Sequence, residues 1–186
     1  MTWLGRDIHG MQGPYEFRED SELLAACLGL LGPAESFLEI GVGNAVNLRR
    51  FSGRFLLSVG TDIEQRNEMK ELKKSKDYEI VIADKASCFR SSVFDVVAFN
   101  PPYLPSEGID DITVDGGAGG IEVPFAFLED AIRVGRAPHK VVIVLSTDSN
   151  VTSFKERCKT IGMRCEVIAQ KKLFFETLYG ILVSEI

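Results

Sequence analysis

The sequence lacks the features that mark several classes of protein. Its four cysteines form no C-x-x-C pair, and its two histidines stand apart, which argues against a metal site or a Ser-His-Asp triad. No apolar run reaches the roughly 18 residues of a membrane-spanning helix. The N-terminus has no apolar segment typical of a secretory signal. We therefore expect a cytoplasmic protein with reduced, buried thiols, no bound metal and no membrane contact.

Basic residues are also fewer than acidic residues. The chain has 21 Lys and Arg against 27 Asp and Glu, a net charge of −6. This acidity argues against broad contacts with the phosphates of nucleic acid. The length of 186 residues and the 45% hydrophobic content are typical of one globular domain with a sizeable core. We expect residues 1–186 to form a single domain whose residues 1–17 are an irregular, aromatic N-terminal arm.

Alternating apolar runs and helical patterns predict an α/β fold. Strands are expected within residues 36–43 (a strand and its glycine turn), 55–62, 78–84, 94–99, 140–146, 164–169 and 177–184. Helices are expected over residues 22–31, 44–51, 64–76, 121–134 and 149–161, with Asp20 or Ser21 capping the first. The last two strands lie too close in sequence for a crossover helix, so they should pair antiparallel. The pattern predicts a doubly wound, mostly parallel, seven-stranded Rossmann-like sheet with one reversed C-terminal strand.

One predicted strand ends in Asn100-Pro101-Pro102-Tyr103. Two prolines cannot donate to a sheet ladder, so the strand must end there, at the sheet edge where α/β folds bind ligands. The Asn100 side-chain oxygen and the Pro101 carbonyl can accept the hydrogens of a planar, weakly nucleophilic nitrogen, and Tyr103 offers it a flat face. Such a site would act by positioning. A proline turn that merely ends a strand fits the same residues equally well.

Glu39-x-Gly41-x-Gly43 is part of a dinucleotide fingerprint, and acids follow the next two strands. The third glycine is absent, so this turn alone is weak evidence. Asp62 could accept the ribose hydroxyls of an adenosine ligand, and Asp84 could face its adenine amine. Taken alone, each acid could also be an ordinary helix cap or a solvated carboxylate in a loop. Together with the proline loop, at one sheet edge, they predict a ligand site.

The motifs that the sequence lacks narrow the choice of ligand for this site. The sequence has no G-x-x-x-x-G-K-[ST] for a triphosphate, and Glu39 would repel a pyrophosphate. An adenosine ligand with a zwitterionic tail and no phosphate fits better. S-adenosylmethionine is such a ligand, and its sulfonium cation suits an acidic pocket.

At this point the sequence resembles the HemK-type class I methyltransferases, and more narrowly their short archaeal and eukaryotic branch. The motifs that carry the resemblance are Glu19-Asp20-Ser21, Leu38–Gly43, Thr61-Asp62, Asn100–Tyr103, Gly116–Gly120 and Glu176-Thr177-Leu178. It spans residues 15–184, nearly the whole chain. Phe17 replaces a usual proline, and Val114 replaces a tryptophan of many eukaryotic members, so these departures bear mainly on substrate fit.

The resemblance implies methyl transfer from S-adenosylmethionine to the glutamine side-chain amide of the Gly-Gly-Gln motif in a class I translation release factor. It also implies a heterodimer with a small zinc-binding activator subunit. The implied cofactor contacts are Ser21, Glu39 and Gly41 at the methionine tail and sugar, Asp62 at the ribose, and Asp84 and Lys85 at the adenine. Asn100 and Pro101 would hold the acceptor amide, with Tyr103 beside it.

Two alternatives remain open. The proline loop also fits an N6-adenine methyltransferase of DNA or RNA, which would need an unstacked base in the pocket. The acidic charge and the lack of a target-recognition domain weigh against it. The chain could also be a non-catalytic binding module with a methyltransferase fold, although the complete set of pocket acids argues against degeneration.

Overall fold

The computed structural model describes residues 19–64 and 76–186. The arm expected over residues 1–17 and most of the helix expected over residues 64–76 lie outside the described residues.

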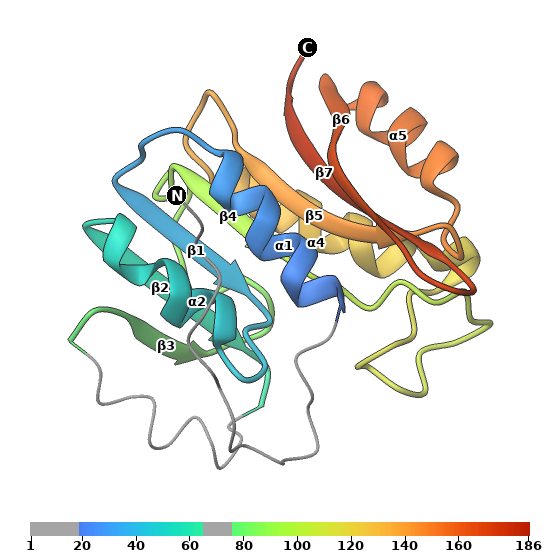
Figure 1. Ribbon diagram of the computed structural model, residues 1–186, viewed down its shortest axis with the longest axis horizontal. Helices are drawn as coiled ribbons and strands as arrows, with labels where there is room; N and C mark the ends of the chain where they lie inside the picture. Colours follow the sequence, from blue (N-terminus) through green and yellow to red (C-terminus); the bar gives the residue numbers. More distant parts are fainter. Residues whose placement is uncertain (1–18, 65–75) are drawn as a thin grey trace.

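Within the described residues, seven strands form one sheet in the order β3-β2-β1-β4-β5-β7-β6 (Figure 1). They are β1 Ser36–Ile40, β2 Leu57–Asp62, β3 Glu79–Ile82, β4 Val96–Phe99, β5 Val141–Ser146, β6 Met163–Lys172 and β7 Thr177–Glu185. The first five strands pair in parallel, whereas β7 pairs antiparallel with both β5 and β6. The predicted doubly wound, mostly parallel sheet with a reversed C-terminal strand is confirmed.

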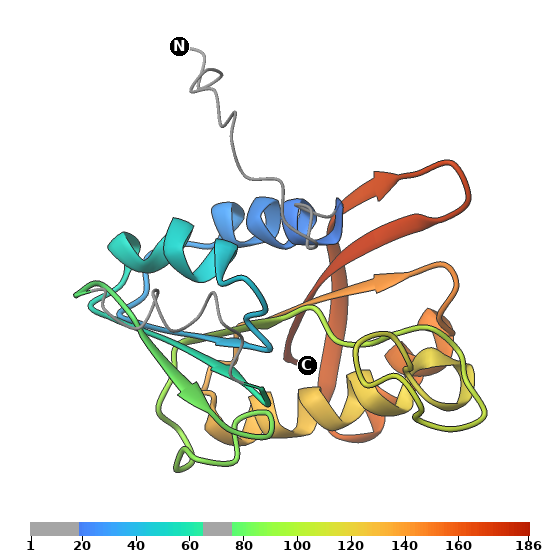
Figure 2. The same cartoon turned by 90° about the horizontal axis from the view of Figure 1, so that it is seen from below.

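Helices cover both faces of the sheet (Figure 2). On one face lie α1 (Glu19–Leu30) and α2 (Val46–Phe51), and on the other lie α4 (Glu122–Val134) and α5 (Val151–Thr160). The central strands β1, β4 and β5 are buried along their whole length. Burial on both faces explains why these strands read as continuous apolar runs rather than alternating ones. No helix in the described ranges is long and apolar enough to cross a membrane.

Several predicted boundaries differ from those observed. Asp20 and Ser21 do not cap the first helix, because that helix already begins at Glu19 and holds both residues in its first turn. The last helix starts later than predicted, after Asn150, whose side chain accepts a hydrogen bond from the Ser153 N–H (3.0 Å).

The strand predicted to end at Ala169 continues to Lys172, past an irregularity in its pairing between Val167 and Ala169. The connection to β7 is therefore a tight turn. One of the four thiols expected to be buried, Cys88, is exposed.

Helix α1 lies directly on β7 because Gly180 has no side chain. A Cβ built at Gly180 would stand 2.1 Å from the Cys27 Sγ, where two atoms cannot coexist. This close approach holds α1 against β7 in the C-terminal half of the sheet.

We expect Gly180→Ala to lower the free energy of unfolding by about 1–3 kcal/mol, because the added methyl group must displace Cys27 or α1. A Cys27→Ala/Gly180→Ala variant should recover part of that loss, because both changes act on one contact. Gly29→Ala on the same helix, where a Cβ meets nothing within 4 Å, should be neutral or stabilising. Urea denaturation measures the free energy of unfolding of these three variants and of Cys27→Ala alone. If the effects of Cys27→Ala and Gly180→Ala simply added in the double variant, the contact would be contradicted.

Candidate functional site

A cleft of about 550 Å³ opens at the carboxyl ends of the parallel strands. Its volume is in the range of small-molecule and cofactor sites. All eleven residues singled out from the sequence line it: Ser21, Glu39, Gly41, Gly43, Asp62, Asp84, Lys85, Asn100, Pro101, Pro102 and Tyr103. The fold thus brings the predicted residues together, while their individual roles stay predictions.

The cleft is strongly acidic. Its charged lining residues are Asp20, Glu39, Asp62, Glu64, Asp84, Asp115 and Glu176, with Lys85 as the basic one. Among the described lining residues, seven acidic side chains beside one ammonium group favour a ligand that carries positive charge and oppose one that carries phosphates.

The glycine turn after β1 is tied to the end of β2. Gly41 (φ +74°) and Gly43 (φ +52°) take left-handed conformations that glycine adopts without strain. The Gly41 N–H donates to the Thr61 carbonyl (2.8 Å), and the Gly43 N–H donates to Asp62 Oδ2 (2.9 Å). The turn therefore fixes the Asp62 carboxylate beside the backbone of the first βα unit.

Asp62 keeps acceptor capacity after these bonds. Its Oδ2 accepts from the Gly43 N–H, and its Oδ1 accepts a longer bond from the Glu64 N–H (3.2 Å). A carboxylate oxygen has two lone pairs, so each retains one that could accept from a ligand hydroxyl.

Glu39 is a buried carboxyl group with an open acceptor. It is 4% exposed, and its Oε2 has no hydrogen-bond partner within the described part of the chain. Desolvation raises the pKa of Glu39 to about 8, against hydrogen bonds from the Leu48 backbone and the Asn47 side chain that lower it. A cation placed beside this group would favour its ionised form.

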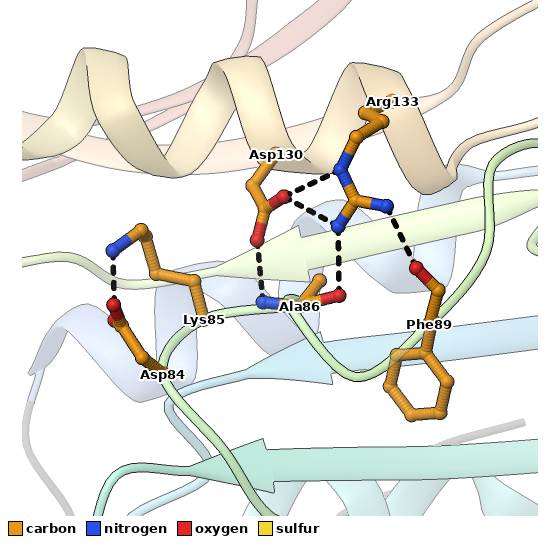
Figure 3. A network of polar contacts seen from close by, with 6 residues as sticks. All are labelled: Asp84, Lys85, Ala86, Phe89, Asp130 and Arg133. Atoms are coloured by element: carbon orange, nitrogen blue, oxygen red, sulfur yellow. Dashed lines mark hydrogen bonds and ion pairs between the residues drawn. The ribbon is translucent and has the colours of Figure 1, made fainter.

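The loop that carries Asp84 and Lys85 is bound to α4 by an arginine-carboxylate pair (Figure 3). Asp130 accepts from the Ala86 N–H (2.7 Å) and from the Arg133 guanidinium (2.6 Å). Arg133 also donates to the carbonyls of Ala86 and Phe89 (2.8 and 2.7 Å). This network holds the loop after β3 at the rim of the cleft.

Asn100 is held with a defined amide orientation. Its Nδ2 donates to Asp20 Oδ2 (2.7 Å), and an ionised carboxylate can only accept, so the amide nitrogen must face Asp20. Its Oδ1 is buried and has no hydrogen-bond partner among the described residues. A buried acceptor left open costs free energy, which is typical of a site that a ligand completes.

Sequence reasoning missed this role of Asp20 by assigning it as a helix cap. The partner lies 80 positions away in the sequence. The available signal was the Glu19-Asp20-Ser21 motif, because an acid beside a predicted pocket residue is a candidate to orient an amide.

The proline loop rests on the glycine-rich segment that follows it. A Cβ at Gly120 would stand 2.1 Å from the Tyr103 carbonyl oxygen. The Ser149 hydroxyl donates to that same oxygen (3.2 Å), and Leu104 exchanges backbone hydrogen bonds with Val114 and Gly116 (2.9 and 2.7 Å). The segment that follows the proline loop, residues 106–120, is therefore anchored at its base and also lines the cleft.

No family profile matches the sequence. The chain is 30% identical over 178 residues, 88% of each protein, to a Methanocaldococcus jannaschii protein provisionally assigned as a protein N5-glutamine methyltransferase. It also resembles a chain of the E. cuniculi Mtq2–Trm112 complex, which is responsible for methylation of the translation termination factor eRF1. That match has a TM-score of 0.74 and 26% identity over 92% of this chain and 98% of that one.

A Haloferax volcanii complex of a methyltransferase with its Trm112 activator shares the fold. The TM-score is 0.62 at 12% identity, over 90% of each chain.

We expect Glu39→Gln to stabilise the ligand-free protein at high pH. The pKa of Glu39 is raised to about 8 in the folded state. The shift therefore leaves the stability of the fold in full below about pH 4.5, and the fold loses stability as the pH rises towards about 8. Gln mimics the protonated carboxyl group, so the variant should be about 2–5 kcal/mol more stable near pH 8.5 and little different near pH 5. Urea denaturation at both pH values measures this, and a stability difference that does not change with pH would contradict the assignment.

Proposed function

Since the chain belongs to the HemK-type family of protein N5-glutamine methyltransferases, we propose that its acceptor is the Gly-Gly-Gln glutamine of a class I translation release factor. The enzyme is a methyltransferase that depends on S-adenosylmethionine. We also propose that residues 1–186 form one domain and that the enzyme acts in the cytoplasm, where release factors work.

The observation that carries this proposal is the open Asn100 Oδ1 beside the acidic cleft. A glutamine amide nitrogen is a poor nucleophile because its lone pair is delocalised into the carbonyl group. Acceptors at Asn100 Oδ1 and the Pro101 carbonyl would bind its two N–H groups and aim its lone pair at the methyl donor. As positive charge develops on the nitrogen, the same acceptors stabilise it. Tyr103 lines the cleft beside them and would pack against the flat amide.

The cleft residues fit the cofactor. When bound, S-adenosylmethionine supplies a methyl group carried on a positively charged sulfur. The buried open oxygen of Glu39 suits a cationic tail, and the remaining lone pairs of Asp62 suit vicinal hydroxyls. Of the other cleft residues, we assign Ser21 and Gly41 to the tail and sugar, Gly43 to holding Asp62, and Asp84 and Lys85 to the adenine.

An adenine N6 amine could use the same acceptors, so a nucleic-acid methyltransferase is the second candidate. The seven carboxylates that line the cleft oppose a phosphate backbone. The E. cuniculi relative acts on a protein, which favours the first candidate.

We further propose that the enzyme works with a small activator subunit. The E. cuniculi relative and the H. volcanii neighbour are both complexes with Trm112. In the described part of this chain, β3 forms an edge of the sheet and exposes Ile82. An exposed apolar sheet edge is a surface that proteins commonly cover with a partner.

We expect the purified enzyme, with labelled S-adenosylmethionine, to modify one glutamine of the release factor, located by mass mapping. Asn100→Ala should lower kcat by about 100-fold or more, because the acceptor amide loses its positioning group. Replacing the Gly-Gly-Gln glutamine by asparagine in the substrate is the control for site specificity. Methylation of adenine instead, or an unchanged kcat in Asn100→Ala, would overturn the proposal.

Asp20 should affect the same step through Asn100. We expect Asp20→Ala to lower kcat by about tenfold, because the Asn100 amide loses its charged partner and can turn over. Asp20→Asn should restore much of the rate, because its side-chain oxygen can still accept from Asn100 Nδ2. Equal losses in both variants, at unchanged melting temperature, would assign Asp20 a role other than orienting the amide.

A further inference from the structure

The turn between β6 and β7 carries two exposed aromatic side chains. The Leu173 N–H donates to the Glu176 carbonyl (2.8 Å), which leaves Phe174 and Phe175 at the tip. These side chains are 92% and 90% exposed, and their rings form a T-shaped pair with centroids 4.6 Å apart. Turn tips favour Gly, Asn, Asp, Pro and Ser, so two phenylalanines there need an explanation outside the fold.

The aromatic tip is joined to the cleft by the residue that follows it in the chain. The next residue, Glu176, lines the cleft, and the buried Ser146 hydroxyl at the end of β5 donates to its carboxylate. Ile109 and Ile112, each about half exposed, line the same cleft from the segment after the proline loop. Both the hairpin tip and that segment project at one end of the sheet (Figures 1 and 2). Two segments that contribute to the cleft lining therefore carry exposed apolar side chains.

We propose that Phe174 and Phe175 form a docking surface for the protein substrate around its methyl-accepting side chain. This inference rests on the proposed function and extends it from the acceptor amide to the surrounding substrate surface. All described helices and strands belong to the sheet and its two covering layers. Among the described residues, the segments next to the cleft are placed to contact the substrate beyond the amide, and aromatic side chains, Phe included, are enriched in protein interfaces.

The charges around the mouth favour a protein over a nucleic acid. Glu107, Asp110 and Asp111 are exposed on the segment that carries the two isoleucines, and they would repel phosphates. On the hairpin, Lys171 is paired with Glu19 and Glu22 of α1, and Lys172 is exposed. The carboxylates around the cleft outnumber the ammonium groups that are not paired. A nucleic acid whose bases stacked on the two phenylalanines would therefore have its phosphates repelled.

The test uses the full chain co-expressed with its activator subunit and two substrates, an intact release-factor domain and a short peptide containing Gly-Gly-Gln. We expect a Phe174→Ser/Phe175→Ser variant to raise KM for the intact domain by about tenfold or more, with kcat at saturation unchanged. Turnover of the short peptide should change by less than about twofold, because the peptide does not reach the tip. Direct binding of the intact domain, measured by calorimetry, should weaken by the same factor as KM rises.

Leu30→Ser is the matched control. Leu30 is 65% exposed at the far end of α1, away from the cleft, and its replacement should leave KM for both substrates unchanged. Failure of the wild-type protein to methylate either substrate would refute the proposed function itself. Normal wild-type activity with an unaffected Phe174→Ser/Phe175→Ser variant would refute only the docking surface. The variant could instead lose binding to the activator, to a second copy of the chain or to single-stranded RNA, with KM unchanged. Any of these results would assign the tip to another occupant and would also refute the docking surface for the substrate.

Discussion

The site depends above all on the hydrogen bond from the Asn100 amide nitrogen to the Asp20 carboxylate. An amide can present either its oxygen or its nitrogen, and a carboxylate partner, which accepts and does not donate, selects the amide nitrogen. Asp20 supplies this constraint from the first turn of α1, which Gly180 allows to lie directly on the sheet. The position of one helix thus decides which atom of Asn100 is left open for a ligand.

The second constraint is that acidic groups are held in a poorly solvated cleft. Glu39 is desolvated enough that the pKa of Glu39 rises to about 8, and it still has an open oxygen. Asp62 remains a good acceptor because backbone N–H groups hold it in place without using all its lone pairs. Such an arrangement costs stability in the empty protein and becomes favourable when a cation enters. This is the usual relation between stability and activity at a binding site.

The sequence predicted much of this fold because its signals are local. The apolar runs gave the central strands, since strands buried on both faces have no polar alternation. The proline pair marked the end of β4 beside Asn100, and the glycine turn marked the end of β1. Boundaries failed where packing extended an element, as in β6, whose residues up to Lys172 pair with β7 across an irregular register.

The residue types and their spacing alone determined that an acidic, glycine-bounded pocket would lie at the carboxyl edge of a parallel sheet beside a proline-locked amide. Backbone stereochemistry sets these features within a few residues of each position. Only the tertiary structure decided that Asp20 orients Asn100 and that the turn carrying the exposed Phe174 and Phe175 leads into the cleft through Glu176. Both depend on contacts between elements far apart in the chain, and no local propensity encodes which helix face or which turn will arrive there.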